Sequence, residues 1–207
     1  MKATDFDIII AGAGPGGCAC ALSLAESGLS IGMLEKAKFP RDKICGDAMS
    51  PDVLNQMAKL TGNLREDFLA NNASEKVDVT GVRIVSASGK VAELSIEDEG
   101  EKITGWVAKR IDFDNYMFAK ASALPNVTAI EDCSVIDVEQ RPDSVMCRTT
   151  KGEMCAAMVI GADGAHSVIS KKLTDFKMKS AAYKRKLSRS LTTNDSPSSL
   201  SKKTRTE

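Results

Sequence analysis

The sequence contains a single histidine, His166, and no Gly-x-Ser-x-Gly segment. A hydrolase triad requires a histidine beside an activated nucleophile, so the sequence argues against hydrolase chemistry and favours a passive role for His166. No stretch approaches the roughly 18 apolar residues that indicate a membrane helix, and we expect no transmembrane segment. An apolar fraction of 43% is nevertheless ample for a buried core.

The cysteines show no framework spacing; they are Cys18, Cys20, Cys45, Cys133, Cys147 and Cys155. Cys18 and Cys20 lie two positions apart on a predicted helix and face different sides, so they cannot readily share a metal. Asp5 and Asp7 interrupt the apolar N-terminus, which argues against a secretory signal. We therefore interpret the cysteines as reduced thiols, expect no metal site, and predict a cytoplasmic location.

Acidic and basic residues are equal in number but unevenly distributed. Residues 177–207 carry nine Lys or Arg against two Asp or Glu, together with eleven Ser or Thr. Without apolar periodicity, this basic segment is predicted to be a disordered tail. It lacks the interleaved aromatic side chains that stack on bases, so we expect no nucleic-acid partner and leave peripheral membrane contact open.

Glycines at a fixed spacing follow the first apolar run. Ile8–Ile10 predict a buried strand, and Gly12, Gly14 and Gly17 then match Gly-x-Gly-x-x-Gly. The first glycine permits a tight turn, the second lets a pyrophosphate approach the backbone, and the third lets the next helix pack closely. The free N–H groups at the start of that helix favour phosphate. The pattern predicts a dinucleotide site.

An acidic residue completes this unit. A second apolar segment, residues 31–34, is followed by Glu35, at about the separation of 20 residues where an acid can accept hydrogen bonds from an adenosine ribose. Strand, glycines, helix, strand and acid occur in the order of a βαβ unit. The sequence has no second glycine fingerprint for a separate nicotinamide domain, which argues against a disulfide-reductase layout.

The remaining pattern predicts an α/β fold with a parallel sheet, a β-meander and an incomplete second β-sheet beginning at about 77–107. Ser50-Pro51 suits a helix start, Asp112 is the expected cap of a helix, and residues 77–96 should form a β-hairpin. Helices are expected at residues 15–27, 51 to about 70, 113–123 and 167 to about 173, and strands at 6–11, 30–35, 106–109, 127–130, 135–139, 145–149 and 154–160.

A second motif, Gly161-Ala-Asp163-Gly164, follows the last expected strand. It lies too far along the chain to belong to the first βαβ unit. A carboxylate at a strand end beside a flexible glycine can reach a cofactor hydroxyl, or an ordered water near a pyrophosphate. A plain NAD dehydrogenase does not need such a feature there.

With these motifs the chain resembles the glutathione-reductase-type FAD fold, in the branch of para-hydroxybenzoate hydroxylase-like enzymes, and within it the geranylgeranyl reductase family. The resemblance covers residues 5–175 and is carried by the glycine motif with Glu35, Phe39-Pro-Arg-Asp-Lys-Ile-Cys-Gly-Asp47, Arg110-Ile-Asp-Phe-Asp114, and the Asp163 motif. It implies a Rossmann-like FAD-binding domain at 1–176, interrupted by part of a substrate domain at about 77–107.

The resemblance also implies cofactor-binding residues, namely Gly12, Gly14, Gly17, Glu35, Lys36, Arg41, Cys45, Gly46, Arg110, Asp163 and Gly164. The glycines and Glu35 would bind the ADP half of FAD, and Asp163 would serve the pyrophosphate and ribityl region. Arg41 and the Cys45-Gly46 turn would lie near the flavin. Cys45 is also the candidate catalytic residue, either as a redox or substrate-facing thiol or, alternatively, as a small buried hydrophobe.

The activity implied by the resemblance is reduction of isolated C=C bonds in a prenyl, lipid or other small-molecule substrate, with electrons delivered to FAD by NAD(P)H or ferredoxin. Members of the family continue well past Phe176 with a further Gly-Asp-Ala motif, which this sequence does not show after Phe176. We therefore expect a truncated, N-terminal fragment. Two alternatives stay open: an FAD-dependent monooxygenase, and a catalytically inactive fragment.

Overall fold

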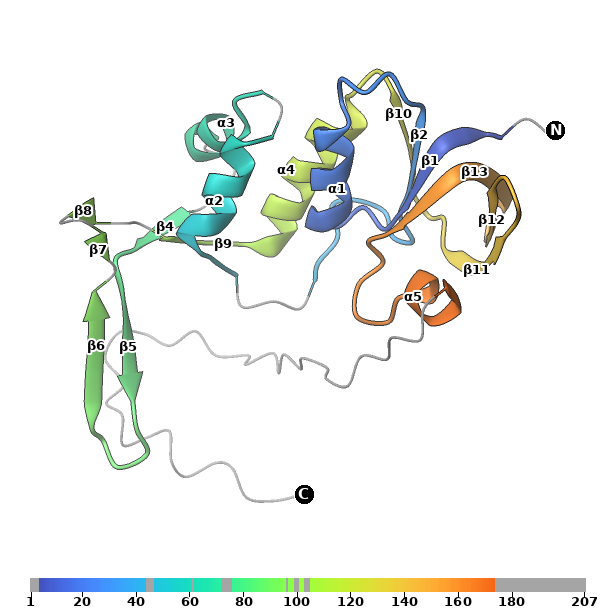
Figure 1. Cartoon of the computed structure of the whole chain (residues 1–207). Helices are drawn as coiled ribbons and strands as arrows, with labels where there is room; N and C mark the ends of the chain where they lie inside the picture. The colour runs from blue at the N-terminus through green and yellow to red at the C-terminus, as the bar shows by residue number, and fades with distance from the viewer. Residues whose placement is uncertain are drawn as a thin grey trace.

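The computed structural model describes residues 4–43, 47–60, 62–71, 76–95, 97–98, 101–102 and 105–173 (Figure 1). The predicted tail at 177–207 and the Cys45-Gly46 turn lie outside these residues. Every helix in the described part of the chain is too short or too polar to cross a bilayer.

A six-stranded mixed sheet forms the centre of the fold, in the order β10-β2-β1-β13-β12-β11. Its strands are β1 (Phe6–Ala11), β2 (Ile31–Leu34), β10 (Val127–Ile130), β11 (Val135–Gln140), β12 (Val145–Thr149) and β13 (Gly152–Gly161). β10, β2, β1 and β13 are parallel, whereas β11, β12 and β13 form an antiparallel meander. The predicted α/β fold with a parallel sheet and β-meander is confirmed.

The helices described in the structure are α1 (Pro15–Ser23), α2 (Pro51–Ala58), α3 (Leu64–Ala70), α4 (Arg110–Ser122) and α5 (Val168–Leu173). Ile8 and Ile10 of β1 pack on the side of α1 and α4, while Ile9 and Ala11 pack with the meander and α5. Figure 1 shows α1 and α4 beside each other along one face of the sheet. A parallel strand covered on both faces requires this continuous apolar run.

Smaller antiparallel elements follow the first βαβ unit. β3 (Ala48–Met49), β9 (Gly105–Ala108) and β4 (Lys76–Val79) form a three-stranded sheet, β5 (Gly81–Val85) pairs with β6 (Val91–Ser95), and β7 (Glu97–Asp98) pairs with β8 (Glu101–Lys102). The hairpin predicted at 77–96 is thus confined to β5 and β6. β4 pairs instead with β9, because the break at Thr80 lets the chain change partner.

Three helical segments differ from the prediction, and one of them, expected at 51 to about 70, is divided into α2 and α3. The helix expected at 15–27 ends at Ser23 and continues as turns. The helix expected at 113–123 begins at Arg110, so Asp112 lies in its first turn and is not its cap. The Arg110 backbone N–H donates to Asp47 Oδ1 at 3.3 Å, and this contact from a distant segment satisfies one of the free donors at the helix start.

Candidate functional site

The glycine turn joins the two motifs found in the sequence. Gly12 has a φ of +97°, and a Cβ there would lie 2.4 Å from the Ala162 carbonyl oxygen. A Cβ on Gly17 would lie 1.9 Å from the Gly12 carbonyl oxygen. The packing of the backbone is therefore sufficient to require glycine at both positions. The contact of Gly12 with Ala162 also shows that the loop carrying Asp163 lies directly against the turn.

Gly14 is different, because the protein itself leaves room for a side chain there. Its backbone is extended, with φ −69° and ψ −179°, and a Cβ would meet Arg41 Nη2 at 3.5 Å, an ordinary contact. Helix α1 begins at Pro15, directly after Gly14. Gly14 is the N-cap residue of this helix, and it has no side chain that could accept a hydrogen bond from the first turn. The open N-terminus of α1 can accept an anion, which its free N–H groups and dipole favour.

Glu35 is buried beside this turn, with 4% of its surface exposed. Its Oε2 accepts the Ala13 N–H at 3.0 Å, and its Oε1 accepts the Ala37 N–H at 3.1 Å. The predicted proximity of the acid at the end of β2 to the glycine turn is therefore confirmed. Because a carboxylate offers about four acceptor positions, it retains capacity for sugar hydroxyls.

A chain of buried charges continues from Glu35. Arg41 Nε lies 3.4 Å from Glu35 Oε1, and Arg41 Nη1 donates to Asp114 Oδ2 at 3.2 Å. On its other side, Asp114 Oδ1 accepts from Arg110 Nε and Nη2, each at 2.8 Å. The structure thus brings Arg41 and Arg110 together on one carboxylate, and no role for Asp114 was expected from the sequence.

The signal for Asp114 was present in the sequence. It lies four residues after Arg110 and three before Met117, within the buried side of α4 that also contains Phe113 and Tyr116. A charged side chain at a position surrounded by core residues is costly unless it is paired. An acid in an otherwise apolar helix face therefore indicates buried cationic partners.

Asp163 holds the loop before α5. Its Oδ2 accepts the backbone N–H groups of Val168 at 2.6 Å and Ile169 at 3.3 Å, while Ser167 Oγ accepts the Ser170 N–H at 2.8 Å. Asp163 Oδ1 is buried with no hydrogen-bond partner among the described residues. One oxygen thus stabilises the fold, and the other is a spare acceptor beside the glycine turn.

Replacing Asp163 by alanine should lower the free energy of unfolding by about 1–2 kcal/mol, because two N–H groups at the start of α5 lose their acceptor. Asp163→Asn keeps an acceptor oxygen and should lose less. Urea unfolding of the two variants measures the difference. Equal stability of Asp163→Ala and the unaltered protein would contradict the capping role.

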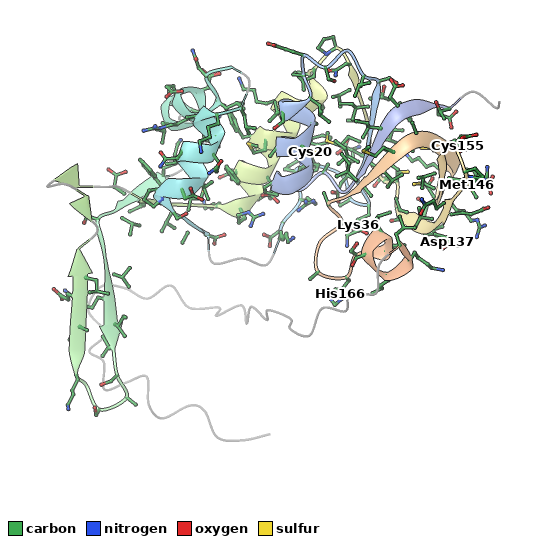
Figure 2. All side chains as sticks on the ribbon, viewed as in Figure 1. Cys20, Lys36, Asp137, Met146, Cys155 and His166 are labelled. Atoms are coloured by element: carbon green, nitrogen blue, oxygen red, sulfur yellow. The ribbon has the colours of Figure 1, made fainter. Side chains whose placement is uncertain are left out.

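The other predicted residues take different positions. Gly164 has a φ of +81°, which suits the loop turn. Lys36 follows Glu35 but is exposed, and Figure 2 shows it on the same end of the sheet as the N-terminus of α1. Cys45 and Gly46 lie outside the described residues.

Cys18 is buried under the glycine turn. Burial raises the pKa of its thiol to about 12, so the thiol is chemically inert near neutral pH.

A largely apolar groove of about 310 Å³ adjoins the site between α1, α2 and α4. Its lining includes Pro15, Met49, Val53, Met57, Arg110 and Phe113. Pro15 starts α1 and Arg110 belongs to the buried charge network, so the groove opens next to both. Within the described residues no cluster of three or more His, Cys, Asp or Glu side chains could hold a metal ion.

These features together fit an adenine dinucleotide. The open start of α1 suits a pyrophosphate, Glu35 suits a ribose, and Arg41 Nε and Asp163 Oδ1 are buried polar atoms without a hydrogen-bond partner in the described chain. Buried polar groups are normally satisfied, so these two atoms are consistent with a polar ligand at this position.

Comparison with known proteins identifies an FAD binding domain family and several reductases as similar to this chain. The FAD binding domain family matches residues 5–204, which extends beyond residue 176. The menaquinone reductase of Mycolicibacterium smegmatis is 28% identical over 176 residues, covering 82% of this chain and 40% of that protein. The digeranylgeranylglycerophospholipid reductase of Methanosarcina acetivorans is 28% identical over 171 residues, covering 80% and 39%.

A solved structure shows the same similarity. The geranylgeranyl bacteriochlorophyll reductase-like protein of Thermoplasma acidophilum is 27% identical and superposes with a TM-score of 0.62, covering 77% of this chain and 39% of that one. The chain thus spans about two fifths of the length of the relatives it matches. By the family match, which includes the glycine turn, Glu35 and the Asp163 loop, this chain belongs to the FAD binding domain family, and its cofactor is FAD.

Proposed function

We propose that the open start of α1 and the glycine turn hold the pyrophosphate of FAD, and that Glu35 holds the ribose of its adenosine. Arg41 and Arg110, both linked to Asp114, supply positive charge along the cofactor, and Asp163 Oδ1 accepts a hydrogen bond from it or from a bound water. The proposed contacts with FAD also include Lys36, Cys45, Gly46 and Gly164. The buried acceptor at Glu35 and the uncapped helix next to it support this placement.

We further propose that the protein is a reductase of the geranylgeranyl reductase type, acting on C=C bonds of prenyl or lipid substrates. The observation that carries this proposal is that two of its relatives are reductases named for menaquinone and for digeranylgeranylglycerophospholipid. Both compounds are lipids with isoprenoid chains. The proposal places part of a substrate domain in the β3–β9–β4 sheet and the β5–β6 hairpin, within a cofactor domain that extends to residue 176.

The contribution of this chain to such a reaction is binding, orientation and the exclusion of water. FAD supplies the hydride chemistry when bound. The groove beside Pro15 and Arg110 offers apolar walls that exclude water from one side of the proposed site. Arg41 packs over the Phe39 ring with its guanidinium carbon 4.8 Å from the ring centre, which fixes its position at the turn. A lipid substrate would also bring the protein into peripheral contact with a membrane.

Product analysis tests the reaction class. The protein reconstituted with FAD is given NADPH or reduced ferredoxin together with menaquinone or digeranylgeranylglycerophospholipid, and mass spectrometry and oxygen uptake are followed. Addition of two hydrogens to a C=C bond of the isoprenoid chain, located by fragmentation and distinct from reduction of the quinone ring, is expected without oxygen insertion. Insertion of an oxygen atom with oxygen uptake would instead identify a monooxygenase, and FAD binding without turnover of either kind would identify an inactive domain.

A further inference from the structure

Asp114 occupies the centre of the charge network, yet it has no place in the proposed contacts with FAD. Its side chain is fully buried, with 0% exposed, and the Arg41 and Arg110 side chains are 15% and 17% exposed. Arg41 comes from the loop after β2, and Arg110 from the first turn of α4. The described contacts of Asp114 therefore tie two segments distant in sequence to a single carboxylate.

The order of charges in the network explains why a carboxylate is needed there. From the glycine turn outwards it runs Glu35, Arg41, Asp114, Arg110, with the signs alternating at each step. Two guanidinium groups at half-buried positions repel each other unless an anion lies between them. Arg41 contacts two carboxylates, those of Glu35 and Asp114. Its contact with Glu35 is the weaker one, since Arg41 Nε makes no hydrogen bond.

We propose that Asp114 is a positioning residue for the cofactor: it draws Arg41 away from Glu35 and holds Arg41 and Arg110 at two points along FAD. This inference rests on the proposed placement of FAD. Without the Asp114 charge, Arg41 has Glu35 as its remaining carboxylate partner in the network and turns towards it. The acceptor positions of Glu35 that the ribose requires are then occupied by Arg41.

A double-mutant cycle on FAD affinity tests this role. The four proteins are the unaltered chain, Asp114→Asn, Arg41→Gln and the double variant, each titrated with FAD by calorimetry. Asp114→Asn should weaken FAD binding by about tenfold or more, and should weaken it clearly less once Arg41 is glutamine, because only its contact with Arg110 is then left to lose. A merely structural role of Asp114 gives the same loss in both backgrounds, and that additive result would overturn the proposal.

Asp137 provides the matched control. It is also a carboxylate between two cations, Arg148 at 3.4 Å and Lys172 at 2.9 Å, but it lies on β11 in the meander (Figure 2). Asp137→Asn should leave FAD affinity unchanged, and a tenfold loss there would contradict a specific role for Asp114. If Asp114→Asn does not fold, Asp114→Glu takes its place in the cycle, because it keeps the buried charge but displaces both guanidinium groups.

The same titrations separate the two proposals. If the unaltered, folded chain binds no FAD, the proposed placement of the cofactor fails and the role of Asp114 fails with it. If the unaltered chain binds FAD at one site and the cycle is additive, the placement stands and only the role of Asp114 is rejected.

Discussion

Replacement of Gly17 by alanine is expected to lower the free energy of unfolding by about 3 kcal/mol or more. The added Cβ would lie 1.9 Å from the Gly12 carbonyl oxygen, and only 3.3 Å from Ile10 Cγ2. The closest atom belongs to the backbone of a turn that is itself fixed against Ala162, so it cannot move aside as a flexible side chain could. Helix α1 would have to separate from β1, and the parallel sheet would lose its cover.

Gly16 is the matched control for this prediction. It is the adjacent residue of the same helix, and a Cβ there meets no atom within 4 Å. Gly16→Ala should therefore keep or slightly raise stability, because alanine is favoured over glycine in a helix. Thermal unfolding of both variants without cofactor provides the comparison. Similar melting temperatures for Gly17→Ala and Gly16→Ala would show that α1 does not pack on the turn as described.

Glu35→Gln is expected to weaken FAD binding by about a hundredfold. The reason is that charge-assisted hydrogen bonds to the ribose hydroxyls contribute about 1.5–3 kcal/mol each, and the amide also leaves Arg41 without one of its anionic partners. The variant should still fold at some cost in stability, since the amide oxygen can accept the Ala13 N–H while the Ala37 N–H loses its acceptor. Fluorescence titration with FAD and circular dichroism measure the two properties separately.

Glu139 is a suitable comparison for Glu35, because it is an exposed acid paired with Arg141 on β11. Glu139→Gln should bind FAD as the unaltered protein does. A Glu35→Gln variant that folds and retains full FAD affinity would mean that the buried carboxylate serves the protein structure alone.

The parts predicted correctly from the sequence are those governed by local pattern. The apolar run at 8–10, the glycine spacing and the acid at 35 specify a strand, a turn, a helix start and a second strand within one short segment. The parallel pairing of β1 with β2 and the bond from Ala13 to Glu35 follow from that order. The strands expected at 135–139, 145–149 and 154–160 likewise correspond to β11, β12 and β13 of the meander.

The parts predicted wrongly depend on distant segments. The start of α4 is set by Asp47, which accepts a hydrogen bond from the Arg110 N–H 63 positions further along the chain, and no local pattern reports such a contact. Similarly, the alternation of apolar and polar residues at 77–96 predicted one hairpin, but β4 pairs with the distant strand β9 in the three-stranded sheet. The role of Asp163 in the cofactor site stays a prediction, and the structure adds that one of its oxygens accepts N–H groups at the start of α5.

Competition binding tests most directly whether the βαβ unit holds an adenine dinucleotide. The folded protein is titrated with FAD, and ADP and FMN are then added as separate competitors. Binding at one site, displaced by ADP and much less readily by FMN, is the expected result, because Glu35 and the start of α1 recognise the adenosine and pyrophosphate. Displacement by FMN as readily as by ADP, or no binding of FAD to the folded protein, would contradict it.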